Sequence, residues 1–123
     1  MKKVRQILAI FGLATIMFVA APPVAAQAAA WDCPTSNMCV WDGANGTGKR
    51  CAWSDRDADW HNSPTVCSWA KNWPVRSARN NSRVNVYIFN TPHSVNGADP
   101  ILSLSSRSSS PDVRFYGSWH YFY

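Results

Sequence analysis

The fold is decided by the stretch Trp41-Asp42-Gly43-Ala44-Asn45-Gly46-Thr47-Gly48. It contains Asn45-Gly46, and because both residues tolerate a positive φ, this dipeptide favours a tight hairpin. Short β-prone runs flank it, residues 38–41 before and residues 49–53 after. The sequence therefore predicts two paired strands joined by this turn.

The rest of the chain also favours strands over helices. No stretch after the first thirty residues keeps an apolar i, i+3, i+4 period over three turns, and Glu is absent from the sequence. Further strands are expected at residues 65–69, 75–78, 83–89, 101–104, 113–116 and 119–123. The Ser-rich stretch 103–110 is expected to be an exposed loop. Short strands separated by frequent turns predict an all-β sandwich.

The first thirty residues resemble a secretion signal. Three basic residues precede an apolar run from Ile7 to Ala21, two prolines end the run, and Ala26-Gln27-Ala28 offers the small-x-small pattern of a cleavage site. The run is shorter than the roughly 20 residues that a membrane-spanning helix needs. We expect a signal peptide at residues 1–28, cut after residue 28 or 30, and a secreted domain at residues 31–123 with no membrane attachment.

The mature chain is too short for two domains and is only weakly basic. Residues 31–123 contain nine Lys and Arg against seven Asp, a net charge of +2. The arginines are scattered along the sequence and form no basic stripe, which is the usual mark of a nucleic-acid binder. We therefore expect no nucleic-acid partner.

Four cysteines, Cys33, Cys39, Cys51 and Cys67, lie in the mature part. An even count in a short secreted chain predicts two disulfides. Three pairings are open, and we favour Cys33–Cys39 with Cys51–Cys67 because they join nearest neighbours. The cysteine spacing and the positions of the three histidines do not follow a zinc-ligand pattern, so no metal is expected.

Two features carry a family resemblance, and the first is Trp41 followed by Gly48. An aromatic seven positions before a glycine resembles the Greek-key signature of the βγ-crystallins. In that signature the aromatic packs over a folded hairpin, and the glycine takes a backbone shape that other residues resist. The resemblance implies that a later serine hydrogen-bonds to the hairpin backbone, and Ser77 is the candidate.

The second feature is the order of landmarks between Cys33 and about Phe89. The four cysteines, the tryptophans and Gly48 fall in a register that resembles the small secreted bacterial proteins of peptidase inhibitor family thirty-six. This resemblance implies a single βγ-crystallin-like domain that inhibits an extracellular protease. The best-known member of the family inhibits thermolysin-type metalloproteinases.

The second half of the chain departs from that pattern. Seven positions after Phe89 stands Asn96, and Gly97 comes one step late. The inhibitory loop of the best-known member is held by a second-half disulfide, but no cysteine follows Cys67 here. The reactive-site residues of that member therefore correspond to no position in this sequence.

A protease inhibitor needs a rigid exposed segment that fits the protease cleft, since rigidity lowers the entropic cost of binding. Two segments qualify in the sequence: residues 91–100 with His93, and residues 103–111 with Arg107. We expect a monomer that binds an extracellular protease through one of them. A carbohydrate or cell-wall binding module and a small antimicrobial toxin of the same fold are the alternatives.

Seven tryptophans in the mature chain bear on the carbohydrate alternative, because indole rings can stack on sugars. Trp41 and Trp53 are expected to be buried structural residues, whereas Trp60 and Trp73 are expected to be partly exposed.

Catalysis, metals and cofactors are not expected. The sequence has no Gly-x-Ser-x-Gly nucleophile motif. Asp55, Asp57 and Asp59 alternate like the start of a calcium loop, but Trp60 and Val66 stand where that loop needs Gly and Glu.

Overall fold

The computed structural model describes residues 29–94 and 97–123. Its elements are β1 (Met38–Trp41), the short 3₁₀ turn η1 (Ala44–Gly46), β2 (Arg50–Trp53), β3 (Ser77–Asn80), β4 (Val86–Phe89), β5 (Leu102–Leu104), β6 (Ser109–Ser110) and β7 (Trp119–Phe122). The expected signal peptide lies outside the described residues. Among the residues that the structure describes, no helix is long and apolar enough to span a membrane.

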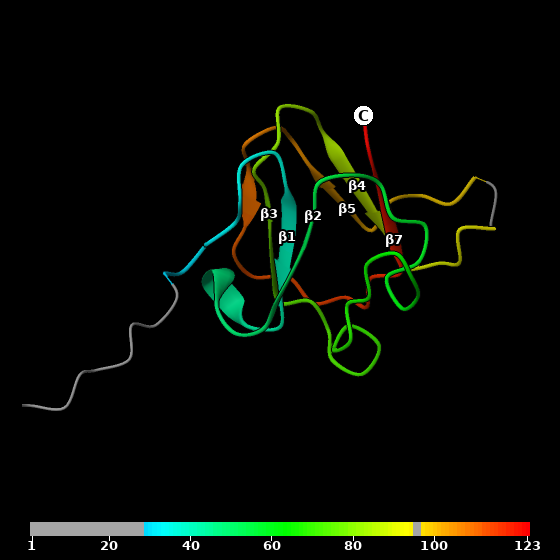
Figure 1. Cartoon of the computed structure of the whole chain (residues 1–123), viewed down its shortest axis with the longest axis horizontal. Coiled ribbons are helices and arrows are strands. Elements are labelled where there is room, and N and C mark those ends of the chain that lie inside the picture. Colours follow the sequence, from blue (N-terminus) through cyan, green and yellow to red (C-terminus); the bar gives the residue numbers. More distant parts are fainter. Residues whose placement is uncertain (1–28, 95–96) are drawn as a thin grey trace, which may run out of the picture.

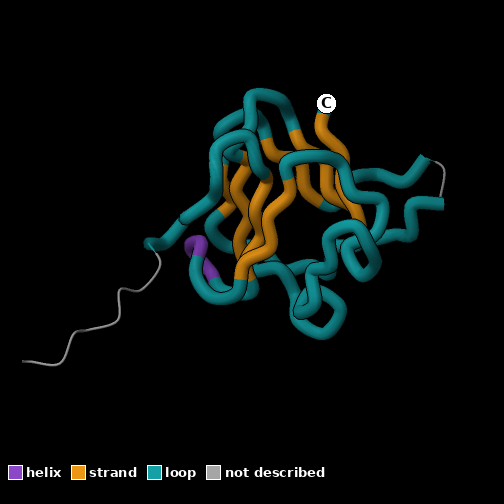
Figure 2. Tube along the Cα trace, viewed as in Figure 1, coloured by secondary structure: helices purple, strands orange, loops and turns teal. Residues whose placement is uncertain are grey.

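The strands form two antiparallel sheets that face each other (Figures 1 and 2). The first sheet has the order β2-β1-β3-β6, and the second has the order β5-β4-β7. Strand β6 comes from the second half of the chain but pairs with β3 of the first sheet. In return, Asp57 of the first half pairs with His120 of β7 in an isolated bridge. The predicted all-β sandwich is confirmed. Each half of the chain also contributes a segment that pairs with the sheet of the other half, β6 with β3 and Asp57 with His120.

The core lies between the sheets and follows from the alternation of side chains along each strand. Met38 and Val40 of β1 face Val86 and Ile88 of β4 in one buried apolar cluster. Val84 belongs to the predicted strand 83–89 but is exposed, because β4 begins only at Val86.

The two favoured disulfides are confirmed. Cys33 pairs with Cys39 and fixes the N-terminal segment against β1. Cys51 of β2 pairs with Cys67 and ties the long connection between β2 and β3 to the core. The cysteines of the described chain are therefore all oxidised.

Some strand predictions were wrong. Residues 65–69 form turns, and residues 113–116 contribute only the bridge between Phe115 and Val75. The predicted loop at residues 103–110 contains β6, whose serines pair by backbone groups with Ala78 and Arg79. Such pairing needs no apolar side chain, so periodicity gives no signal for it.

Candidate functional site

The hairpin between β1 and β2 is folded back and held by Ser77. The Ser77 hydroxyl accepts a hydrogen bond from the Gly46 N–H at 2.9 Å and donates one to the Gly43 carbonyl at 2.6 Å. Gly48 has φ 85°, and a side chain there would overlap the Asp42 carboxylate. These contacts fix the shape of the turn, so this hairpin has little freedom to adapt to a partner.

Trp41, the last residue of β1, lies on the outward face of the first sheet, next to the hairpin. It is buried and packs edge-to-face against Trp31, with ring centroids 5.5 Å apart. The disulfide Cys33–Cys39 lies in the same small cluster. The outward face of the first sheet is thus covered by the N-terminal segment.

The second sheet repeats the strand arrangement but lacks the serine. In the first sheet Trp41 pairs with Ser77, and in the second sheet Phe89 pairs with Trp119 at the corresponding place. Trp119 cannot hydrogen-bond two backbone groups of a turn as a hydroxyl does. Instead its indole stacks on Phe89, with centroids 3.9 Å apart and planes 6° apart.

The connection between β4 and β5 consequently projects from the body of the domain, as the yellow segment of Figure 1 shows. We call its described parts, residues 90–94 and 97–101, the β4–β5 arms. His93 is exposed and meets the Trp119 ring edge-on at 4.7 Å. The Ile101 N–H donates to the Ile88 carbonyl at 2.8 Å and closes the base of the arms. The base of the arms is thus held against the sheet, while most of their side chains, including His93, are exposed.

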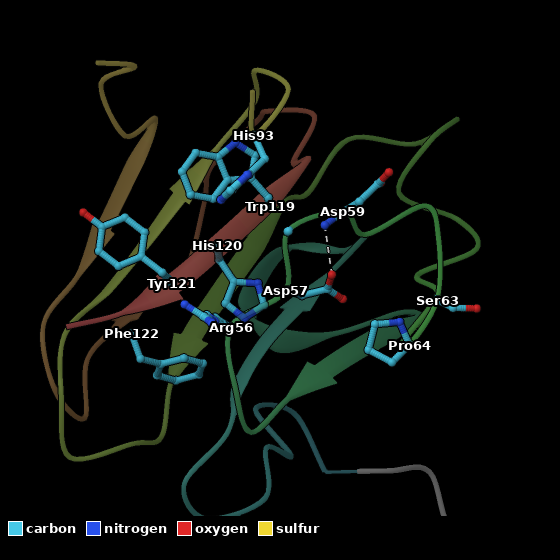
Figure 3. A pocket seen from close by; sticks show the side chains of 11 residues that line it. Arg56, Asp57, Asp59, Ser63, Pro64, His93, Trp119, His120, Tyr121 and Phe122 are labelled. Carbon is cyan, nitrogen blue, oxygen red and sulfur yellow. Dashed lines mark hydrogen bonds between the residues drawn. The ribbon is translucent and has the colours of Figure 1, made fainter. Parts of the chain in front are cut away.

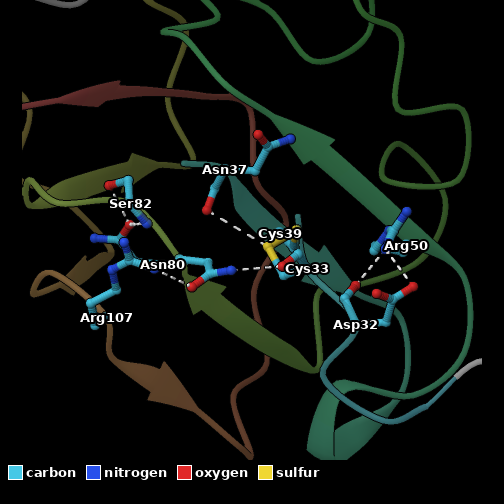
Figure 4. Close-up of a disulfide and its surroundings, with 9 residues drawn as sticks. Asp32, Cys33, Asn37, Cys39, Arg50, Asn80, Ser82 and Arg107 are labelled. Carbon is cyan, nitrogen blue, oxygen red and sulfur yellow. Dashed lines mark hydrogen bonds and ion pairs between the residues drawn. A yellow bond between two sulfur atoms is a disulfide. The ribbon is translucent and has the colours of Figure 1, made fainter. Parts of the chain in front are cut away.

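Arg107, the other sequence candidate, lies in a tight turn over residues 105–108. Its backbone has φ 60°, and the Ser108 N–H and hydroxyl both donate to the Ser105 carbonyl. The guanidinium donates to the Asn81 side-chain oxygen at 2.9 Å, and the Asn81 amide donates to the Cys33 carbonyl. Figure 4 shows this turn beside the first disulfide. His93 and Arg107 therefore contact different segments and do not form a common site.

Asn80 secures the base of the same turn. Its side-chain amide donates to the carbonyls of Val84, Leu104 and Ser105, at 2.7, 3.1 and 3.1 Å. Its side-chain oxygen accepts from the Ser82 hydroxyl. The Asn80-Asn81-Ser82 run thus joins the two halves of the chain through hydrogen bonds.

A buried polar cluster around His120 also joins the two halves. Trp60 Nε1 donates to His120 Nδ1 at 2.8 Å, and His120 Nε2 lies 2.9 Å from the Asp55 carbonyl. Because Nδ1 accepts, the imidazole proton sits on Nε2 and is donated to that carbonyl. Burial lowers the pKa of His120 to about 4, although the Asp55 carbonyl acts in the opposite direction. His120 is therefore neutral at physiological pH.

The same cluster includes a buried carboxylate. Asp57 accepts from Trp53 Nε1 at 2.9 Å and from the Asp59 N–H at 2.9 Å. Trp53 and Trp60 stack with centroids 4.7 Å apart. The indoles of Trp53 and Trp60 thus both pack in the core and donate hydrogen bonds. No group of three His, Cys, Asp or Glu in the described part of the chain is arranged to hold a metal ion.

The expectation for Trp60 was wrong, because its side chain is 0 % exposed. Its partner His120 lies sixty positions away, so no local pattern could reveal this contact. Trp73 is exposed as expected, at 60 %, and Trp41 and Trp53 are buried as expected. The tryptophans do not form one exposed row.

A cleft of about 710 Å³ lies between residues 56–64 and β7. Trp119, Tyr121, Arg56 and Asp59 are among the residues that line it (Figure 3). The His61 N–H and, next, the Asn62 amide lower the pKa of Asp59 below its ordinary value, so it carries a negative charge. The cleft combines aromatic rings with the guanidinium of Arg56 and the carboxyl groups of Asp57 and Asp59, of which Asp57 is buried.

Comparison with known proteins agrees with this architecture. A solved structure from work on the evolution of the eye lens βγ-crystallin domain fold is similar to the chain, with a TM-score of 0.56 and 12 % identity over 74 % of this chain and 89 % of that chain. At this identity the likeness shows the fold, and the predicted βγ-crystallin-like fold is confirmed. No curated protein matches the sequence significantly. The model of peptidase inhibitor family I36 matches residues 26–100, more than half of the sequence. The chain therefore belongs to peptidase inhibitor family I36.

Proposed function

We propose that this protein is a secreted, monomeric inhibitor of an extracellular protease, and that it binds the enzyme through the β4–β5 arms. Family membership supports an inhibitory role in which the protein binds and does not catalyse. The observation that carries the assignment to the arms is Trp119 at the place of Ser77. Without the hydroxyl, the second hairpin is not folded back and its connection stands away from the domain.

The arms combine exposure with restraint. Pro92 and Pro100 fix φ near their positions, and the base is closed by the bond between Ile101 and Ile88. A segment restrained in this way loses little conformational entropy on binding. The turn that carries Arg107 is rigid too, but it is closed on itself and its guanidinium is engaged by Asn81. A protease cleft receives an extended strand, which a closed turn cannot supply.

A metalloproteinase is the proposed target, since this is the class implied by the resemblance to the best-known family member. The experiment is a titration of the purified, oxidised secreted protein against a thermolysin-class metalloproteinase, with subtilisin and trypsin in parallel. We expect stoichiometric inhibition of the metalloproteinase. Full activity of all three enzymes at micromolar protein would contradict the inhibitory function.

Two single variants locate the binding segment. His93→Ala is expected to weaken inhibition about tenfold or more, because interface hot spots lose about that much on truncation. Arg107→Ala is the matched control at the other candidate segment, and its inhibition constant should stay within a factor of two. The reverse result would move the protease site to residues 105–108.

Secretion is proposed together with this function. N-terminal sequencing of the protein from culture medium should begin at Ala29 or Trp31. A product that keeps Met1 and stays with the cells would contradict the signal peptide at residues 1–28.

A further inference from the structure

Most side chains on the outward face of the second sheet, along β4 and β7, are aromatic. Val86 and Ile88 of β4 and His120 of β7 point inward and are buried, so the alternating residues point outward. These are Tyr87 and Phe89 of β4, Trp119 and Tyr121 of β7, and Tyr123 beyond it. An antiparallel sheet usually turns polar side chains toward water. Phe89 is buried beneath Trp119 and serves packing, so the question of a further role concerns the rings that remain partly or fully exposed.

The rings form one continuous layer. Tyr87 lies 5.3 Å from Tyr121, and Trp119 lies 6.0 Å from Tyr121 with planes 26° apart. Tyr87, Trp119 and Tyr121 are half-buried, and Tyr123 is 79 % exposed. Part of this layer faces solvent in the folded protein.

The cleft of about 710 Å³ opens at the edge of this layer, and its volume lies in the range of small-molecule sites. Trp119 Nε1 is buried without a hydrogen-bond partner among the described residues. The Arg56 side chain, which also lines the cleft, is exposed and makes no ion pair within the described ranges 29–94 and 97–123. The cleft thus presents two donors and aromatic rings that the fold does not fully use. It also presents the Asp59 carboxylate, whose oxygens accept from the His61 N–H and the Asn62 amide and keep further lone pairs for a ligand.

We propose that this cleft binds a neutral carbohydrate chain. A pyranose ring has an apolar face of C–H groups, which suits the rings of Trp119 and Tyr121, and a rim of hydroxyls. Those hydroxyls can accept from the Arg56 guanidinium and donate to the Asp59 carboxylate, so the cleft offers a hydrogen-bond donor and an acceptor to a ligand rich in hydroxyl groups. A protein strand is disfavoured here, because the edge of β7 is already paired at His120 with Asp57.

This site is separate from the protease-binding function proposed above, although His93 stands at its rim. The two functions are therefore tested with variants that leave His93 intact. Arg56→Ala removes an exposed side chain that makes no ion pair within the described residues. Tyr121→Thr removes a ring but keeps a β-branched residue in β7.

The experiment measures depletion of the purified secreted protein by three insoluble neutral polysaccharides, namely chitin, cellulose and a β-1,3-glucan. Calorimetric titration with soluble fragments of the polysaccharide that retains the protein follows. We expect retention on at least one of the three and a fivefold or greater loss of affinity for both Arg56→Ala and Tyr121→Thr. Trp73→Ala is the control, because it removes another exposed tryptophan outside the cleft and should leave affinity unchanged.

The carbohydrate site is overturned if none of the three polysaccharides retains the protein, or if Arg56→Ala binds as well as the parent. An equal loss for Trp73→Ala would show non-specific adsorption and would also overturn it. Protease inhibition by Arg56→Ala should be unchanged. If inhibition were lost instead, the cleft would belong to the protease interface and not to a carbohydrate.

Discussion

The two halves of the molecule build the same strand arrangement with different chemistry. The first half contains both disulfides, a hairpin fixed by Ser77 and an outward face covered by the N-terminal segment. The second half contains no cysteine, replaces the serine by Trp119 and leaves its outward aromatic face partly exposed. The comparison teaches that one half supplies the stable frame, and the other presents the surfaces that can bind.

The largest expected effect is the loss of the disulfide in the frame. Replacing Cys51 and Cys67 by Ser opens a 17-residue loop and should lower the free energy of unfolding by about 3 kcal/mol in the chain-entropy model. Replacing Cys33 and Cys39 opens a shorter loop and should cost about 2 kcal/mol. Denaturant unfolding under oxidising conditions measures both. If the loss for the Cys33–Cys39 variant equalled or exceeded the loss for the Cys51–Cys67 variant, loop length would not determine how much each disulfide stabilises the fold.

The next effect compares a glycine in each hairpin. Gly48→Ala places a methyl group against the Asp42 carboxylate that accepts from the Lys49 N–H, at a positive φ. We expect a loss of about 2.5 kcal/mol from backbone strain and the weakened hydrogen bond. Gly97→Ala meets nothing within 4 Å, so only the strain of its φ of 75° remains, about 1 kcal/mol. Similar losses, measured by thermal unfolding, would contradict the difference between the hairpins.

Acid should weaken the junction of the halves at His120. Its folded pKa of about 4 lies below the unfolded value of 6.5, so the unfolded state takes up the proton first. The contribution of neutral His120 to the free energy of unfolding is complete above about pH 6.5 and is lost as the pH falls toward 4. At pH 5 the free energy of unfolding should be lower by about 2 kcal/mol. Unfolding at pH 7.5 and pH 5 measures this loss.

His120→Asn serves as the control for the acid effect, because it removes the titrating group while keeping one donor and one acceptor. The same pH dependence in parent and variant would place the acid sensitivity elsewhere.

The smallest expected loss of stability comes from removing the Ser77 hydroxyl and tests how much it stabilises the first hairpin. Ser77→Ala leaves the buried Gly46 N–H and the Gly43 carbonyl without their partner and should cost about 1.5 kcal/mol. Ser103→Ala, on the exposed face of β5, should change stability by less than 0.5 kcal/mol. Hydrogen exchange should show faster exchange at Gly46 in the first variant alone.

Local patterns predicted the parts of this fold that local chemistry determines. Asn45-Gly46 marked the first hairpin because its turn needs positive φ, and nearest-neighbour spacing favoured the observed disulfides. Residues 65–69 read as a strand through their apolar side chains, but the backbone turns there to bring Cys67 to Cys51.

The candidate site was less predictable, because it depends on contacts between distant segments. His93 was singled out from its loop, but its position against Trp119 required the fold. The burial of Trp60 depends on His120, and the cleft forms only where residues 56–64 meet β7. No sequence pattern predicts that β6 pairs with β3 or that Asp57 pairs with His120, because both pairings form through backbone groups.

The pairing of strands from both sides of the β4–β5 connection has a consequence for a chain that is cut there. A nick in the connection between Phe89 and Leu102 would separate the chain into two pieces without releasing either. Strand β5 would remain paired with β4, β7 with β4, and β6 with β3. The backbone hydrogen bonds of both sheets would therefore hold the two pieces together as one folded body.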